Sequence, residues 1–139
     1  MMKFDKKYFS HFNFSTVEIK KHFENALKDI NIAEIDKIPD VKFNYAYSAV
    51  IKLGIALLSY YQIKVKSVPG HHIKIIERLA EALRDDSIND IGNAMRSKRN
   101  IGMYSGGLEV TEKECEEYVD FVQKLITRVK VIITARSGA

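Results

Sequence analysis

Cysteine, proline and glycine are all scarce in this chain, and tryptophan does not occur. The single cysteine, Cys115, excludes an internal disulfide and fits a reducing compartment. Its neighbours Glu114, Glu116 and Glu117 are acidic, which is expected to raise the thiol pKa, so we do not expect a nucleophile there. Two prolines and seven glycines among 139 residues leave few breaks, which favours long helices over many short strands.

Long apolar runs are missing as well. The longest candidate, residues 49–61, is interrupted by Lys52 and is shorter than the roughly 18 apolar residues of a membrane span. The N-terminal stretch MMKFDKKYF carries lysines with no apolar segment behind them, unlike a secretory signal. We therefore expect a cytoplasmic protein with no membrane segment.

The charges are unevenly distributed along the chain. The formal net charge is +4, with acids gathered in residues 109–120 and bases in residues 64–74, 96–99 and 128–136. This segregation favours an anionic partner, either RNA or a nucleotide. The contents of 46% hydrophobic and 29% charged residues are ordinary for one globular domain of this length.

The chain begins with an aromatic and basic segment, residues 1–14, that shows no clear period. We expect it to form an N-terminal arm that packs against the body or against a second copy. A capping box of Ser15 and Glu18 then opens an amphipathic helix that is predicted to run to about Asp36. Pro39 is expected to end that segment.

The second predicted helix begins with Asp40 as its N-cap and continues to about Gln62. It is apolar nearly all round, which is typical of the central, buried member of a bundle. Lys52 is the exception on this helix and must reach solvent, pair or line a cleft. Residues 63–67 alternate like a short strand, but no partner strand is evident, so we predict a loop there.

Three further helices complete the predicted bundle. One spans residues 71–84, and the next begins with Ser87 as its cap. The last opens with a second capping box, Thr111 with Glu114, and ends in the β-branched residues 131–134, which are expected to fray. Five helices with short connections predict an all-α bundle over residues 15–139.

The segment RSKRNIGMY, residues 96–104, is the main functional candidate. It supplies Arg96, Lys98, Arg99, Asn100 and Tyr104. On a helix, Arg99 falls about 20° from Ile88, on a stripe that is apolar up to that point. Two explanations remain open. Arg99 supplies a planar cation for a phosphate, with Asn100 and Tyr104 orienting the same ligand, or the cations only complement the helix dipole.

This segment resembles the signature of the HEPN superfamily, an arginine followed after four to six residues by a histidine near the end of a late helix. Asn100 matches the polar residue that often follows the arginine. The apolar second helix, FNYAYSAVIKLGIALLSYY, and the stretch KVKSVPGHH that opens the third are similar to small HEPN proteins of bacteria and archaea. The resemblance covers roughly residues 15–134.

The resemblance implies a homodimeric, four- or five-helix up-and-down bundle with a cleft at the subunit interface. Members with the complete motif are metal-independent endoribonucleases, many of them toxins or defence effectors encoded beside a small nucleotidyltransferase. Arg99 then stabilises the scissile phosphate, Asn100 is the adjacent polar residue, and Tyr104 stands where the histidine is expected. Because a tyrosine titrates near 10 rather than near neutrality, Tyr104 is a hydrogen-bond donor and a poor base.

His71 and His72 are the other candidates for proton transfer. With Lys74, Arg96 and Lys98 they are predicted to form a supplementary phosphate- or nucleotide-binding patch; the alternative is that both histidines are ordinary residues at a helix start. Adjacent residues on a helix point about 100° apart, and no other His, Cys or carboxylate cluster has ligand spacing. We therefore predict no metal and no cofactor.

Three functions stay open at this point. The first is a HEPN ribonuclease of toxin or defence type. The second is a catalytically inactive HEPN module that binds nucleotide or RNA, or that docks a nucleotidyltransferase partner. The third is a helical dimerisation adaptor whose basic cluster is merely solvated. The tyrosines of the second helix are predicted to belong to the core or to a dimer interface rather than to a base-stacking platform: Tyr45, Tyr47, Tyr60 and Tyr61.

Overall fold

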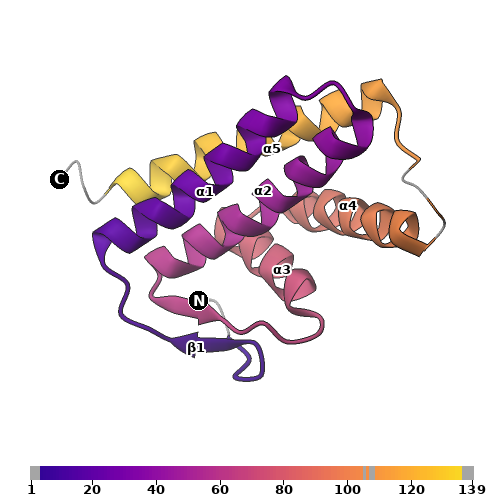
Figure 1. The fold of residues 1–139 in the computed structure, drawn as a ribbon. Coiled ribbons are helices and arrows are strands. Elements are labelled where there is room, and N and C mark those ends of the chain that lie inside the picture. Colours follow the sequence, from indigo (N-terminus) through magenta and orange to yellow (C-terminus); the bar gives the residue numbers. More distant parts are fainter. Residues whose placement is uncertain (1–3, 105, 107–108, 136–139) are drawn as a thin grey trace.

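The chain folds into five helices and a small two-stranded sheet (Figure 1). The computed structural model describes residues 4–104, 106 and 109–135. The elements in order are β1 (Phe9–His11), α1 (Thr16–Ile35), α2 (Pro39–Tyr60), β2 (Ile63–Val65), α3 (His71–Leu83), α4 (Asp86–Tyr104) and α5 (Glu112–Ala135). The predicted all-α class is confirmed for the described part of the chain, with the small sheet as an addition.

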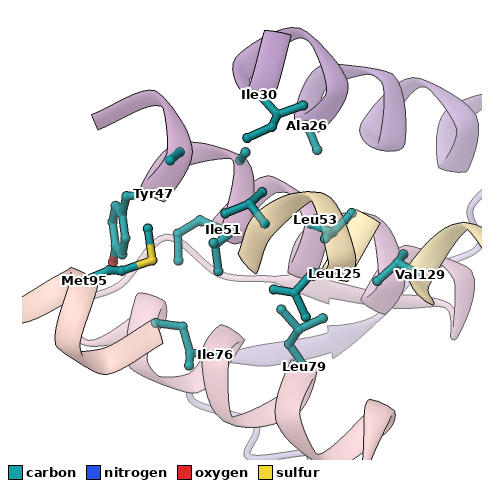
Figure 2. Close-up of a cluster of buried hydrophobic side chains, with 14 of the residues drawn as sticks. Ala26, Ile30, Tyr47, Ile51, Leu53, Ile76, Leu79, Met95, Leu125 and Val129 are labelled. Carbon is teal, nitrogen blue, oxygen red and sulfur yellow. The ribbon is translucent and has the colours of Figure 1, made fainter. Parts of the chain in front are cut away.

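The helix α2 is the centre of the bundle. It packs against α1, α3, α4 and α5 and also touches β2. Most of its apolar residues are buried, as the sequence predicted, and Figure 2 shows side chains of the other four helices converging on it. At Gly54 the approach of α3 is so close that an added Cβ would clash with Cγ2 of Ile75.

Among the described residues, α2 is also the one helix with the length and apolar composition of a membrane span. Most of that span is buried inside the bundle, and a core helix passes the same test of length and composition. The burial of α2 therefore accounts for its apolar character.

Lys52, in the middle of α2, pairs within the bundle. Lys52 Nζ lies 2.9 Å from Oδ2 of Asp29, a buried residue of α1, and the hydroxyl of Ser48 donates to the same oxygen at 2.6 Å. The side chain of Lys52 is 42% exposed, whereas that of Asp29 is 7% exposed. The ion pair therefore keeps a buried carboxylate compensated while the ammonium group remains partly hydrated.

Both predicted capping boxes are present. The Ser15 hydroxyl accepts from the Glu18 amide at 3.1 Å, and the Glu18 carboxylate accepts from the Ser15 amide at 2.9 Å. Thr111 and Glu114 make the same reciprocal pair at the start of α5. The helix α5 ends at Ala135, so the β-branched residues 131–134 finish the helix, as predicted.

Two predicted helix starts were misplaced. Pro39 is itself the first residue of α2, with Ile38 at the N-cap, rather than a residue before an Asp40 cap. Proline suits the first helical position because its fixed φ is helical and its missing N–H is not needed there. The helix α4 begins at Asp86, ahead of the predicted cap Ser87. The capping contact is made instead by the carboxylate of Asp85, which accepts hydrogen bonds from the amide and the hydroxyl of Ser87.

The prediction of a loop at residues 63–67 is also wrong in part. Ile63–Val65 forms β2, which pairs antiparallel with β1 so that Phe9 faces Val65 and His11 faces Ile63. The partner strand lies in the N-terminal arm, where aromatic and basic residues hide any alternation. The pairing places the arm beside the segment that leads into α3 (Figure 1).

Candidate functional site

The predicted motif lies in the last turns of α4. Arg96, Lys98, Arg99 and Asn100 are all partly buried, so the motif lies against the body of the protein and is not a freely solvated tail. Tyr104 is the last residue of α4, and its side chain lies outside the part of the chain that the structure describes.

Arg99 is stacked on a tyrosine that contacts a histidine. The guanidinium carbon of Arg99 lies 5.5 Å from the centre of the Tyr47 ring, a cation–π contact. The Tyr47 hydroxyl is 2.9 Å from Nδ1 of His72, and the two rings are 5.7 Å apart between centroids. Three helices, α2, α3 and α4, thus bring a guanidinium, a phenol and an imidazole together, and we call these residues the Arg99–Tyr47–His72 cluster.

The surroundings shift the pKa values of two members of this cluster. Burial raises the pKa of Tyr47 to about 12, against the opposing effect of Arg99 and Arg96. The pKa of His72 is lowered to about 4, by burial first and then by the electrostatic effects of His71, Arg99 and Arg96. At neutral pH, Tyr47 is therefore protonated and His72 is a neutral imidazole.

The hydrogen bond between Tyr47 and His72 can be made in two arrangements, depending on the tautomer of the imidazole. In one, the phenol donates to Nδ1 and the imidazole carries its own hydrogen on Nε2. In the other, Nδ1–H donates to the phenol oxygen and Nε2 presents a free lone pair. Only the second arrangement gives the site a proton acceptor at Nε2.

The three cations of the motif divide into two groups. Arg96 and Arg99 are three residues apart on one face of α4 and both act on the pKa of His72. Lys98 instead reaches the start of α5, where its Nζ lies 3.2 Å from Oε2 of Glu114 and 3.2 Å from the carbonyl oxygen of Glu109. The phosphate-binding role predicted for Lys98 therefore has a competing partner, whereas Arg96 and Arg99 face the histidines.

The predicted supplementary patch lies beside the cluster at the start of α3. The rings of His71 and His72 are 4.5 Å apart between centroids, and Nδ1 of His71 is 2.8 Å from the carbonyl oxygen of Val68. Lys74 Nζ lies 5.5 Å from the centre of the Tyr8 ring and 3.5 Å from Oε2 of Glu77. The structure thus brings His72, with the ring of His71 packed on it, close to Arg99, which the sequence could not show.

Tyr47 is the residue of this site that the sequence reasoning missed as a functional group. Its assignment to the core is correct, since it is 2% exposed, but it is also the bridge between Arg99 and His72. One signal was available: a buried tyrosine on an apolar helix needs a hydrogen-bond partner for its hydroxyl. Tyr45 and Tyr61, in contrast, are 37% and 39% exposed.

A cavity lies elsewhere, between α1 and α5 at the end of α2. It measures about 800 Å³ and is walled mainly by apolar side chains, including Phe14, Ile19 and Phe23, with Lys20 and Lys130 also among its lining residues. None of the predicted site residues lines it. It brings together no imidazole or guanidinium, so we place the candidate chemistry at the Arg99–Tyr47–His72 cluster despite the size of this groove.

The described residues include no group of three His, Cys, Asp or Glu placed to hold a metal ion. Cys115 is buried, and its thiol donates to the carbonyl oxygen of Pro39 at 3.3 Å. Burial is the main cause that raises the pKa of this thiol, and the predicted effect of Glu114 adds to it. A buried thiol with a raised pKa is a poor nucleophile.

No protein-family model, no curated protein and no solved structure matches this chain. The HEPN resemblance therefore stays a prediction, carried by the residues of the motif and the order of the helices around it.

Proposed function

We propose that this protein is a cytoplasmic, HEPN-like RNA-binding protein that cleaves RNA without a metal ion, with Arg99 on the scissile phosphate and His72 as the proton acceptor. The Arg99–Tyr47–His72 cluster is the observation that supports this proposal. It supplies the planar cation and the imidazole that the HEPN motif pairs, although here the imidazole comes from α3 rather than from the end of α4.

In the proposed reaction, the ribose 2′-oxygen attacks the adjacent phosphorus. The bond from O2′ to phosphorus forms, the bond from phosphorus to O5′ breaks, and the products are a 2′,3′-cyclic phosphate and a 5′-hydroxyl. Nε2 of His72 takes the proton of the 2′-hydroxyl, which requires the arrangement in which Nδ1–H donates to Tyr47. The guanidinium of Arg99 stabilises the charge that develops on the phosphoryl oxygens, and the hydroxyl of Tyr104 is the donor that the motif offers to O5′.

A bound phosphate would also improve His72 as a base. The pKa of about 4 is low because of burial first and then because of the electrostatic effects of His71, Arg99 and Arg96. An anion on Arg96 and Arg99 offsets the contribution of those cations and raises the pKa toward its ordinary value near 6.5. The free protein thus holds a weak base that RNA itself strengthens.

The second candidate is a catalytically inactive HEPN module that binds RNA or nucleotide, or docks a nucleotidyltransferase partner, at the same surface. Two observations favour it: a tyrosine occupies the position of the motif histidine, and His72 is a weak base in the free protein. In either case we propose a homodimer. Ile101 is 63% exposed one turn beyond Lys98 and provides an apolar contact point for a second copy.

The test is incubation of the purified protein with mixed cellular RNA in the presence of a chelator. We expect cleavage that leaves 2′,3′-cyclic phosphate ends, and a fall in rate of about 10²- to 10³-fold for Arg99→Ala and about 10²- to 10⁴-fold for His72→Gln. Lys124→Ala, an exposed substitution on α5, serves as the control and should cleave like the wild type.

Cleavage that survives unchanged in Arg99→Ala would overturn the proposed site. RNA that is bound but left intact by the wild type would overturn the nuclease and establish the binding module. RNA that is neither bound nor cut at physiological salt would leave only the structural adaptor.

A further inference from the structure

A second basic surface lies beside the Arg99–Tyr47–His72 cluster, on the segments that contain β1 and β2. Residues 4–12 and 63–74 together carry five lysines against one acid, Asp5. Lys6, Lys7, Lys64 and Lys66 are all exposed. The carboxylate of Asp5 accepts from the backbone amide of Lys7, so this acid is engaged locally. Because the two segments are paired through the sheet, their charges gather in one place.

Aromatic rings hold several of these lysines in position. Nζ of Lys7 and Nζ of Lys74 lie 5.3 Å and 5.5 Å from the centre of the Tyr8 ring, and Nζ of Lys64 lies 5.0 Å from the centre of the Phe12 ring. Such contacts restrain long, flexible side chains, so less rotamer freedom is lost when the ammonium groups bind an anion. The lysines of this surface are therefore arranged before any ligand arrives.

Contacts connect this surface to the proposed active site. The carbonyl oxygen of Tyr8 accepts a hydrogen bond from the backbone amide of Lys66, which directly follows β2, and Lys74 of α3 lies over the Tyr8 ring. Lys74 lies one turn from His71, whose ring packs on His72, and His72 contacts Tyr47 under Arg99. The result is a series of rings and cations that runs from α4 across the start of α3 to the two strands.

We infer that this surface, built from β1, β2 and the start of α3, is a track that binds single-stranded RNA leading to or from the phosphate held by Arg99. The inference rests on the proposed function, and it adds the class of RNA and the surface that selects it. Positive charge combined with exposed rings is the usual composition of a single-strand site, where cations follow the backbone and unstacked bases lie on aromatic side chains. Phe12, 39% exposed beside Lys64, offers a ring of this kind, whereas the bases of a duplex are stacked on one another and cannot reach it.

The test compares binding of two probes, a dinucleotide and a uridine homopolymer of about 12 nucleotides, which is within the range that single-strand sites cover. Affinity is measured against salt concentration for the wild type, for Arg99→Ala, for Lys7→Gln/Lys64→Gln and for Lys113→Gln/Lys124→Gln. The last pair removes the same charge from exposed positions on α5. Thermal unfolding confirms that each variant is folded.

For the longer probe, we expect the slope of log K against log salt to become shallower by about 1.4 in Lys7→Gln/Lys64→Gln, since each phosphate contact on a single strand contributes about 0.7. The dinucleotide should bind the wild type and the two double-lysine variants equally but Arg99→Ala more weakly, and the α5 control should match the wild type with both probes. An RNA duplex of the same length should bind more weakly than the homopolymer.

The outcomes separate this inference from the proposed function. If Arg99→Ala weakens binding but Lys7→Gln/Lys64→Gln leaves the slope unchanged, the track is wrong and the site at Arg99 stands. If neither change affects binding, both proposals fall. A third outcome would overturn the single-strand assignment: the duplex binds as tightly as the homopolymer, and its salt slope becomes shallower by the same amount in Lys7→Gln/Lys64→Gln. The surface would then be a general polyanion patch.

Discussion

Protonation of His72 should destabilise the fold as the pH falls from 7 toward 4. The pKa of this imidazole is lowered to about 4 in the folded protein, by burial first and then by His71, Arg99 and Arg96. In the unfolded chain it returns to its ordinary value near 6.5. Between these values the unfolded state binds more protons than the folded state, so stability present above the unfolded pKa is lost as the pH falls.

The size of the effect follows from the two pKa values. Each unit of difference corresponds to about 1.4 kcal/mol, so the full shift would give about 3.4 kcal/mol. His72 is only partly buried, and solvent reduces the interaction of its charge with the neighbouring cations. We therefore expect His72 to account for roughly 1–2 kcal/mol of the stability lost between pH 7 and pH 4.

The assay is urea unfolding of the wild type and of His72→Gln at several pH values. Glutamine keeps polar atoms near Tyr47 but does not titrate, and the carboxylates of the two proteins are the same, so the difference between the two curves isolates His72. The wild type should lose about 1–2 kcal/mol more than the variant on acidification. Nuclear magnetic resonance titration of the imidazole gives the pKa directly, and added sulfate should raise it by occupying Arg96 and Arg99.

Two results would refute this reasoning. Parallel curves for the wild type and His72→Gln would mean that His72 does not titrate differently in the folded and unfolded states. A measured imidazole pKa near 6.5 in the absence of anions would mean that the contacts with Tyr47 and Arg99 do not hold the ring in the described environment. Either result would also remove the argument that a bound phosphate strengthens His72 as a base.

Two further predictions concern the core. Lys52→Met should cost about 2–3 kcal/mol of unfolding free energy, because it leaves the buried carboxylate of Asp29 with the Ser48 hydroxyl but without its cation. Asp29→Asn should cost about 1 kcal/mol, because the partly exposed ammonium group can hydrate. Equal losses in urea unfolding would contradict this asymmetry. Gly54→Ala should cost about 1–3 kcal/mol of unfolding free energy through overpacking against Cγ2 of Ile75. Leucine lacks that methyl group, so Ile75→Leu should recover part of the loss in a double-mutant cycle. Additive losses would show that the clash is not the cause.

The parts of the fold that the sequence predicted well depend on neighbours in the chain. The boxes at Ser15 and Thr111 each join residues three apart, so the reciprocal hydrogen bonds could be recognised from spacing alone. The burial of α2 followed from its apolar residues, which cover every face of the helix. The errors at the starts of α2 and α4 were small, because Pro39 and Asp85 fix those starts through contacts with neighbours in the chain.

The parts that were missed depend on residues far apart in sequence. The strand β2 had no visible partner because β1 lies more than fifty positions away, in a segment without alternation. The site shows the same limit: Tyr47, His72 and Arg99 come from three helices, and only tertiary packing brings them together. The cations of the motif were found from their clustering, but the division between Arg99, which faces the histidines, and Lys98, which pairs with Glu114, needed the structure.

The pairing of β1 with β2 also determines the order in which the molecule assembles and opens. Closing a loop of about 50 residues between Phe9 and Val65 costs roughly 3.5 kcal/mol of chain entropy from an unstructured chain, but much less once α1 and α2 have folded back on each other. The sheet therefore forms after this helical hairpin, and with three residues in each strand it is among the first tertiary contacts to open. Hydrogen exchange should find the amides of the sheet far less protected than those of α2, so the surface inferred to receive RNA is also the part of the fold that loosens most readily.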